Sequence, residues 1–439
     1  MKKTAAQMAI REGSKRKNTW HVGVGTSVFL GMMGMTQATP LNEGLVKKSW
    51  GLNSGYGVEA PKAWMQMLGN CAKATTVVAV IDTGIDPNHT ALKDTLWAND
   101  KELKGKDGVD DDGNGFVDDI NGWDFAKNSG KLSDSHGHGT HIAGIIAGFG
   151  KDKDSFKGVC PGTKIMTLRY YDPNGSGEDN LKNTIKAINY AVESKVDIIN
   201  YSGGGAEFAQ GEFEALKKAE KAGILVVAAA GNERSDADKN LYFPAAYNLS
   251  NIISVTAIDE KGQVLPSSNW GIKKVHVAAP GQSILSTLPN GGYGFMTGTS
   301  QATAFVSGIA AMLRAESPKM DFLKIKEIIS NSSQKFPQLQ GKTMMGAKVN
   351  ALLALQMAHG RKLSSEQSTD SLKTAGPPNA LLNRDAGPSM ISKVFGAKDE
   401  RAEGSKNRKA NNLESNRATD SVGLKKIKVS QKKLKKRNR

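Results

Sequence analysis

Cysteine is scarce in this chain. The 439 residues include two cysteines, Cys71 and Cys160, which are too few for the framework of a small disulfide-rich protein and too few for a zinc ribbon. Aromatic residues make up 6% of the chain, and they form no interleaved strip with basic residues of the kind that binds nucleic acid. A sequence repeat with a period of roughly 20–50 residues is also absent. We therefore expect neither specific nucleic-acid binding nor a repeat architecture.

Positive charge is abundant but uneven. The formal net charge is +16, and residues 361–439 contain 20 Lys and Arg against 8 Asp and Glu, which leaves +4 for the first 360 residues. The same segment has one aromatic residue, Phe395, and too little apolar surface to offset the entropy that ordering would cost. We predict a basic, disordered C-terminal tail over 361–439. Two roles are open for it: binding of an anionic surface, and service as a solubilising or degradable extension.

The N-terminus has the pattern of a secretory signal peptide. Basic residues lie between Lys2 and Lys17, an uncharged stretch covers 18–42, and small residues suited to cleavage end at Ala38. The alternative is an uncleaved membrane anchor, but only about 15 residues are strongly apolar and a spanning helix needs about 20. Neither cysteine lies at the cleavage site, so a lipid anchor has no support. We predict a signal peptide over 1–38 and secretion to an extracellular or periplasmic location.

Between these two ends, apolar runs alternate with helical patterns. The runs are continuously apolar, which indicates strands of a parallel sheet that is covered on both faces. We therefore predict an α/β fold and one catalytic domain over 39–360. In sheets of this kind, ligands bind at the carboxyl ends of the strands. The predicted strands are 76–81, 163–169, 196–200, 223–229 and 252–256, and the predicted helices between them are 181–194 and 211–222.

Three segments carry the groups that a nucleophilic serine needs. A serine hydroxyl is a weak nucleophile at neutral pH, so it requires an imidazole as base and a carboxylate that fixes the tautomer of that imidazole. The segments are Val80–Asp86 with Asp82, Ser135–Gly144 with His138, and Gly298–Ala304 with Ser300. The chain order Asp, His, Ser is the order found in subtilisin, and it differs from the order in chymotrypsin and in the α/β-hydrolases.

Four motifs together resemble the subtilase family. They are Asp-Thr-Gly at 82–84, His-Gly-Thr-His at 138–141, Ala-Ala-Gly-Asn at 229–232 and Gly-Thr-Ser at 298–300. The resemblance runs from about Trp50 to Ala358, roughly seventy per cent of the chain. It implies a subtilisin-like three-layer fold, with a mostly parallel central sheet and helices on both faces, and serine endopeptidase activity on protein or peptide substrates. It assigns Asp82, His138 and Ser300 to the catalytic triad and Asn232 to the stabilisation of the oxyanion.

Each triad residue also has a structural interpretation. Asp82 fits a turn, since Asp-Thr-Gly is good turn chemistry. Ser300 fits a helix N-cap, although a nucleophile at a helix start also gains from the positive end of the helix. His136, His138 and His141 resemble a metal cluster, but no carboxylate or cysteine accompanies them at a zinc-ligand spacing. The four motifs in this order favour catalysis.

Glycine-rich edges are expected to pair with an extended substrate by strand addition. The resemblance places them at Gly175-Ser176-Gly177, at Ser202-Gly203-Gly204 and at Ala229-Ala230-Gly231, which precedes Asn232; for Asn232 the alternative is a structural Gly-Asn turn. Gly203 stands where relatives often carry a larger apolar residue. The resemblance is also imperfect after Ser300, because Gln301, Ala304 and Phe305 stand where many relatives have Met, Pro and His. These departures leave the triad intact and affect only the expected substrate preference.

An acidic loop gives a separate signal. Oxygen-bearing side chains occur at alternate positions 110, 112 and 114, and Gly115 follows, which matches the opening of an EF-hand calcium loop. Without a cation these carboxylates would repel one another. The alternative is a solvated acidic loop, and the final bidentate Glu of an EF-hand is absent because Asn121 stands at the twelfth position. We predict a structural Ca²⁺ bound by Asp110, Asp112, Asn114, Phe116 and Asp118.

The resemblance also bears on the two cysteines. If the sheet follows the family's strand order, the strand that begins at Val77 and the one that contains Lys164 are parallel neighbours, so Cys71 and Cys160 lie near the same, amino-terminal edge. Their α-carbons would then fall within the roughly 4.4–6.8 Å that a disulfide requires, and export would place them in an oxidising compartment. We predict a Cys71–Cys160 disulfide, with two unpaired thiols as the alternative.

Two functions are compatible with these features. The first is a secreted serine endopeptidase that works through an acyl-enzyme on Ser300, with His138 moving the proton, Asp82 orienting His138, and Asn232 and the Ser300 backbone amide holding the oxyanion. The second is a catalytically inactive, protease-like binding protein that uses the basic tail to hold an anionic surface. An inactive homologue is expected to have lost a triad residue, and all three are present. The sequence therefore favours the endopeptidase.

Overall fold

The computed structural model describes residues 48–53, 55–151 and 155–361, which belong to one compact unit. The predicted signal peptide and the tail beyond Arg361 lie outside the described residues. No helix within the described ranges has the length and apolar character needed to cross a membrane.

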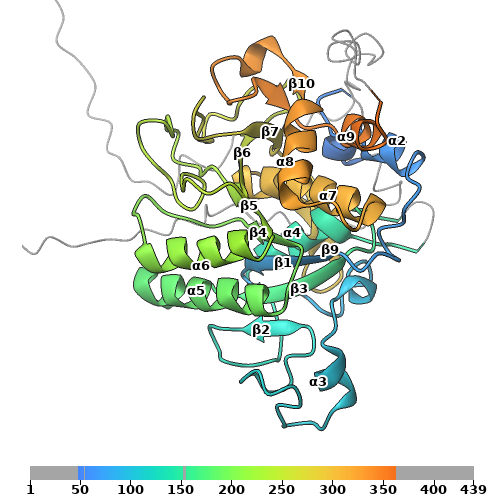
Figure 1. Cartoon of the computed structure of the whole chain (residues 1–439), viewed down its shortest axis with the longest axis vertical. Helices are drawn as coiled ribbons and strands as arrows, with labels where there is room; N and C mark the ends of the chain where they lie inside the picture. The colour runs from blue at the N-terminus through green and yellow to red at the C-terminus, as the bar shows by residue number, and fades with distance from the viewer. Residues whose placement is uncertain (1–47, 54, 152–154, 362–439) are drawn as a thin grey trace, which may run out of the picture. The chain divides into compact units, whose positions relative to one another are not determined.

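A nine-stranded sheet forms the centre of the fold, in the order β10-β11-β7-β6-β5-β4-β1-β3-β2 (Figure 1). Its neighbouring strands are parallel except for the pair β10 and β11. A separate antiparallel hairpin consists of β8 and β9. The strands of the sheet are β1 (Val77–Asp82), β2 (Gly122–Asp124), β3 (Lys164–Arg169), β4 (Ile198–Tyr201), β5 (Leu225–Ala229), β6 (Ile252–Ile258), β7 (Val277–Pro280), β10 (Gln334–Lys335) and β11 (Ala347–Lys348), and the hairpin strands are β8 (Ile284–Leu288) and β9 (Gly292–Met296).

Helices cover both faces of this sheet, as predicted. Successive side chains of a strand point to opposite faces, so Val78 and Val80 of β1 pack in one core with α4 and α7, while Ala79 and Ile81 pack in a second core with α5 and α6. Helices α5 and α6 lie side by side in Figure 1. The helices are α2 (Ala60–Trp64), α3 (Asp100–Lys104), α4 (His138–Ala147), α5 (Gly177–Glu193), α6 (Gln210–Lys221), α7 (Thr299–Glu316), α8 (Phe322–Asn331) and α9 (Ala351–Ala358), with short 3₁₀ turns η1 (Trp50–Leu52), η2 (Lys93–Thr95) and η3 (Pro337–Leu339).

Several element boundaries differ from the sequence-based expectation: β5 begins at Leu225 instead of 223, and β6 ends at Ile258 instead of 256. Two others differ for reasons that local contacts show. Helix α5 begins at Gly177 instead of 181, because the Ser176 side chain accepts a hydrogen bond from the Asp179 backbone amide and caps the helix early. Strand β4 begins at Ile198 instead of 196. The Asp197 carboxylate there accepts hydrogen bonds from the Val77 amide and from Arg314, so this residue ties β1 to α7.

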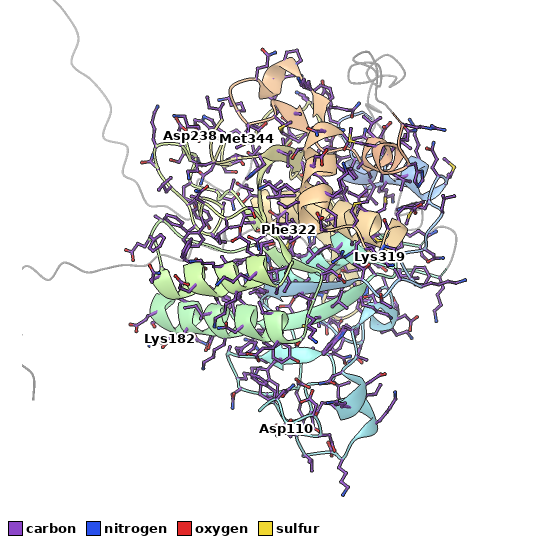
Figure 2. All side chains as sticks on the ribbon, in the orientation of Figure 1. Asp110, Lys182, Asp238, Lys319, Phe322 and Met344 are labelled. Atoms are coloured by element: carbon purple, nitrogen blue, oxygen red, sulfur yellow. A yellow bond between two sulfur atoms is a disulfide. The ribbon has the colours of Figure 1, made fainter. Side chains whose placement is uncertain are left out.

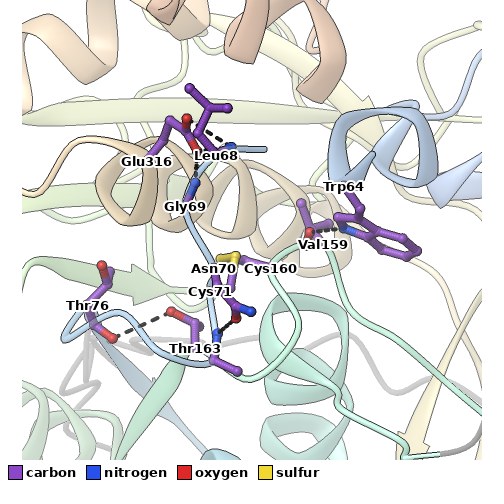
Figure 3. Close-up of a disulfide and its surroundings, with 11 residues drawn as sticks. Trp64, Leu68, Gly69, Asn70, Cys71, Thr76, Val159, Cys160, Thr163 and Glu316 are labelled. Atoms are coloured by element: carbon purple, nitrogen blue, oxygen red, sulfur yellow. Dashed lines mark hydrogen bonds between the residues drawn. A yellow bond between two sulfur atoms is a disulfide. The ribbon is translucent and has the colours of Figure 1, made fainter. Parts of the chain in front are cut away.

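The predicted disulfide is confirmed. Cys71 and Cys160 are bonded, with their α-carbons 5.5 Å apart (Figure 3). The strands that follow them, β1 and β3, are parallel neighbours whose first residues pair, so both cysteines do lie toward the amino-terminal edge of the sheet. The surrounding loops are also held by hydrogen bonds from the Trp64 ring to the Val159 carbonyl and from the Gly69 amide to the Glu316 carboxylate. The bond is therefore part of an already ordered contact between two loops.

Candidate active site

The carboxyl edge of the sheet gathers the residues that the motifs single out. Asp82 is the last residue of β1, Ser202 directly follows β4, and Asn232 follows β5 by three residues. Because β1 is hydrogen-bonded to β4, and β4 to β5, these three positions lie along one side of the sheet. Helix α4 begins at His138, and α7 begins one residue before Ser300. His138 contacts Asp82 and Ser300 contacts Ser202, so the first turns of both helices lie at this edge.

Asp82 and His138 form a buried hydrogen bond. The distance from Asp82 Oδ1 to His138 Nδ1 is 2.7 Å, and both side chains are almost fully shielded from solvent. Burial alone would lower the pKa of His138, but the charge of Asp82 and this hydrogen bond outweigh burial, so the pKa lies above the ordinary value for histidine. Because Nδ1 is engaged by the carboxylate, Nε2 is the ring nitrogen left to exchange a proton.

The turn before α4 is organised by Asp134, which the sequence analysis did not single out. One carboxylate oxygen accepts hydrogen bonds from the Gly137 amide and the Thr83 hydroxyl, and the other accepts from the amide and hydroxyl of Thr140. Thr83 in turn accepts a hydrogen bond from the Gly139 amide. Asp134 therefore fixes the His138 segment against the residue that follows Asp82. Asp134 lies outside the His-Gly-Thr-His motif, so its contacts with Thr83 and Thr140 are evident only from the fold.

Ser300 lies in the first turn of α7 beside the Ser202 segment. Its Oγ donates a hydrogen bond to the Ser202 carbonyl oxygen, 3.1 Å away. The Gly298 amide donates to the Gly281 carbonyl, which ties the entry into the helix to the end of β7. The Ser300 hydroxyl thus stands at the positive end of an 18-residue helix.

The orientation of the Asn232 amide follows from its partners. The backbone amide and the hydroxyl of Thr299 both contact one atom of the Asn232 amide, at 3.1 and 3.2 Å. The Thr299 amide can only donate, so the contacted atom is the oxygen Oδ1. The NH₂ group of Asn232 therefore points away from Thr299, the residue that precedes Ser300.

The three histidines of the second motif have different surroundings. His141 Nε2 contacts the carbonyl oxygens of Ile284 and Gly294, and burial lowers its pKa to about 3. The His136 ring packs edge-on against the rings of His138 and Tyr171, and burial also lowers its pKa. In the described part of the chain, the three do not converge as ligands of a metal.

The glycine-rich edges flank the carboxyl end of β4 and β5. Ser202-Gly203-Gly204 follows β4, and Ala229-Ala230-Gly231 closes β5. The second edge is held by Asn269, which donates hydrogen bonds to the carbonyl oxygens of Ala230 and Gly231. The third edge, Gly175-Ser176-Gly177, leads into α5, which Ser176 caps. Asn269 therefore helps to position the Ala229-Ala230-Gly231 edge, a role that no sequence motif indicated.

Carboxylates of the acidic loop accept hydrogen bonds from backbone amides of the same loop. The Asp110 carboxylate accepts hydrogen bonds from the amides of Gly113, Asn114 and Gly115, and these bonds lower its pKa. Asp118 accepts from the Gly108 amide. The Phe116 ring anchors the loop in the core by edge-on contacts with the rings of Trp123, Phe125 and Tyr190. Figure 2 shows Asp110 in the segment that projects beyond β2.

A cluster of three carboxylates lies beneath this loop. Glu102 of α3, Asp112 and Asp119 each place an oxygen within 4.8 Å of the others. Glu102 and Asp119 are buried, and the amide groups of Asn99 and Asn114 bridge Asp112 and Asp119. Asp112 and Asn114 belong to the predicted calcium ligands. Glu102 and Asp119 do not, because Glu102 comes from a preceding helix and Asp119 from the residue after the predicted set.

The chain is similar in sequence to a family of known proteins. Residues 73–386 match the model of the subtilase family. The chain is 32% identical to subtilisin-like protease 1 of Plasmodium berghei over 72% of its own length and 54% of the relative, so it spans about half of that protein. It is 37% identical to the major intracellular serine protease of Bacillus subtilis over 65% of its own length and 81% of the relative.

A third relative has a similar degree of likeness. The intracellular serine protease of Paenibacillus polymyxa is 37% identical over 58% of this chain and 71% of the relative. The family match covers more than half of the chain and includes all four motifs, and the central sheet between two helical layers is the fold that the resemblance implied. The chain therefore belongs to the subtilase family, a family of serine endopeptidases.

Proposed function

We propose that this chain hydrolyses peptide bonds in protein or peptide substrates through the triad Asp82, His138 and Ser300. The observation that carries the proposal is the buried 2.7 Å contact between Asp82 and His138, at the sheet edge where Ser300 lies in the first turn of α7. Two segments that are 56 residues apart in the chain supply this pair. A turn-forming aspartate has no need of such a partner.

The proposed reaction uses the free nitrogen of His138. The Ser300 hydroxyl turns from the Ser202 carbonyl to His138 Nε2, which takes its proton as Oγ attacks the substrate carbonyl. The same proton then passes to the leaving amine. In the second half, His138 takes a proton from water as the water oxygen attacks the acyl-enzyme; the bond to Ser300 Oγ breaks, Oγ regains the proton, and the acid product is released. Asp82 keeps Nδ1 protonated and stabilises the imidazolium that forms at each step.

Asn232 is proposed to hold the oxyanion together with the Ser300 backbone amide. The contacts of Thr299 support this role, because they hold the carbonyl oxygen of Asn232 and leave its NH₂ group as the donor. A donor that is fixed before the reaction costs no reorganisation when the charge develops, which makes it effective in a water-poor site.

Replacement of the nucleophile tests the proposal. Ser300→Ala should abolish the release of peptides from an unfolded protein substrate and leave the far-UV circular dichroism spectrum unchanged. Ser317→Ala, at the other end of α7, is the matched control and should cleave at the wild-type rate. If Ser300→Ala cleaves at the wild-type rate, the proposed mechanism is wrong. If the wild-type protein cleaves nothing, the inactive, protease-like binding protein becomes the better interpretation.

We also propose that the carboxylate cluster binds a structural Ca²⁺. Three carboxylates that lie within 4.8 Å of one another, two of them buried, repel one another. The amide groups of Asn99 and Asn114 offset part of this repulsion, and a cation would offset more of it. The donor set of Glu102, Asp112 and Asp119 is made of oxygen, which suits a hard cation. The predicted ligands Asp110 and Asp118 belong to the same loop, and backbone amides hold their carboxylates as they also hold that of Glu102.

Secretion is the proposal for the location of the enzyme. The Cys71–Cys160 disulfide supports it, because such bonds persist in oxidising compartments and are rare in the cytosol. Two of the relatives are named as intracellular proteases, so the location needs its own test. N-terminal sequencing of protein recovered from the culture medium should give a start after Ala38. Protein that stays in the cytosol with both cysteines reduced would contradict the proposal.

A further inference from the structure

Two of the edges flank the proposed reaction centre. Ser202–Gly204 follows β4, and the Ser202 carbonyl oxygen accepts a hydrogen bond from the Ser300 hydroxyl. Ala229–Gly231 closes β5 and leads directly into Asn232. Because β4 and β5 are hydrogen-bonded neighbours, the gap between the two edges lies beside the nucleophile. The carbonyl under attack must reach Ser300 and Asn232 together, so the side chain of that substrate residue falls into this gap.

The ring of Tyr242 occupies this gap. A Cβ built on Gly204 would lie 2.6 Å from Tyr242 Cε1, and a Cβ built on Gly231 would lie 2.9 Å from Tyr242 Cδ2. The ring therefore touches a glycine of each edge, one on either side. The residue is 8% exposed. A ring in this position closes the space that a large substrate side chain would need.

Fixed backbone contacts hold Tyr242 in place. The next residue, Phe243, exchanges two backbone hydrogen bonds with Gly205, at 2.7 and 2.9 Å, which clamps its segment to the first edge. On the second edge, Asn269 holds Gly231 through a backbone hydrogen bond and donates to Glu233. The Glu233 carboxylate lies 2.3 Å from the Cβ position of Gly231, so it fills the remaining side of that glycine. Displacement of the ring would disturb both edges.

We propose that Tyr242 is a specificity-determining residue that restricts the substrate residue on the acyl side of the scissile bond to small side chains: Gly, Ala or Ser. This inference rests on the proposed function and names the substrate class for the same site. Steric exclusion is the physical basis. A larger side chain such as Phe or Leu meets the ring before its carbonyl reaches Ser300, and misplacement by about 1 Å is enough to slow the reaction strongly.

A set of peptides that differ only at that substrate residue tests the proposal. The residue is Gly, Ala, Ser, Leu, Phe or Lys, and kcat/KM is measured for each. We expect the wild-type enzyme to cleave the Ala and Ser peptides at least about tenfold faster than the Phe and Leu peptides, the scale of discrimination by pocket size. Tyr242→Gly should raise kcat/KM for the Phe and Leu peptides by about tenfold or more, since these side chains then gain an apolar pocket.

Matched variants separate the ring from its hydroxyl. Tyr242→Phe keeps the ring and should keep the preference for small residues, whereas Tyr242→Ala should open the gap as Tyr242→Gly does. Active enzyme is counted by titration with a serine-directed inhibitor, so partial misfolding does not affect the rates. If the active wild-type enzyme prefers Phe, Leu or Lys, or if both opening variants keep the preference for small residues, the inference is wrong while the proposed function stands. If the wild-type enzyme cleaves no peptide, the proposed function fails first.

Discussion

The Cys71–Cys160 disulfide allows a quantitative prediction about stability. It joins residues 89 apart in sequence, and the loop-entropy model gives a stabilisation of about 4.6 kcal/mol for a loop of that size. For a domain of about 310 residues, unfolding entropy near 60 °C is about 0.65 kcal/mol per kelvin. Loss of the bond should therefore lower the melting temperature by about 7 °C.

The measurement needs a protein that does not digest its own unfolded form. Ser300→Ala serves as the background, and Cys71→Ala/Cys160→Ala is compared with it by thermal unfolding followed by circular dichroism. Both cysteines are buried, so the substitutions also remove packing. Reduction of the background protein by a thiol is therefore the matched control, since it breaks the bond and keeps every side chain. A midpoint that is unchanged by reduction would refute the reasoning, and so would non-reduced peptide maps without the cross-link.

Three further predictions concern the active site and the acidic cluster. Asn232→Ala should lower kcat by roughly a hundredfold to a thousandfold with little change in KM, a range established on subtilisin; a nearly unchanged kcat would mean that another donor holds the oxyanion. Activity requires neutral His138, whose pKa is raised by Asp82, so kcat/KM should rise with pH through an apparent pKa above 6.5. Asp82→Asn removes the charge that favours the imidazolium, so it should move this pKa downward and lower kcat by about four orders of magnitude. If the pKa on the low-pH side of the kcat/KM profile does not change in this variant, His138 is not the titrating base. Calcium should raise the melting temperature, and Glu102→Gln/Asp112→Asn should erase that response while Asp107→Asn, an exposed residue of the same segment, should keep it; a full response in the double variant would place the ion elsewhere.

The fold could be predicted well because its signals are local. The run of β1 is continuously apolar up to the motif residue Asp82, so this strand was evident from the sequence. Boundaries were harder where a polar side chain decided them. The first turn of α5, Gly177-Glu178-Asp179-Asn180, has no apolar residue, and the Ser176 side chain caps it by accepting a hydrogen bond from the Asp179 amide.

Residues that act through tertiary contacts were not predictable in the same way. Asp134 carries no motif, and its role depends on a turn that brings Thr83 and Thr140 to one carboxylate. Glu102 joins the acidic cluster from a helix that precedes the loop. Tyr242 reaches the gap between two edges from a segment that follows Asn232 by ten residues. The sequence shows which residues have side chains suited to catalysis or ligand binding, and the fold determines which of these side chains contact one another.

The central claim is that Ser300 is the nucleophile of a serine endopeptidase. A fluorophosphonate reagent tests it directly, because it forms a covalent bond only with a serine that an adjacent base activates. After reaction with the folded enzyme and digestion, mass spectrometry should place one adduct on Ser300. The adduct should be absent from the denatured enzyme, and it should form much more slowly in Asp82→Asn. An adduct on a different serine, or an enzyme that cleaves protein substrates and never acquires the adduct, would contradict the account.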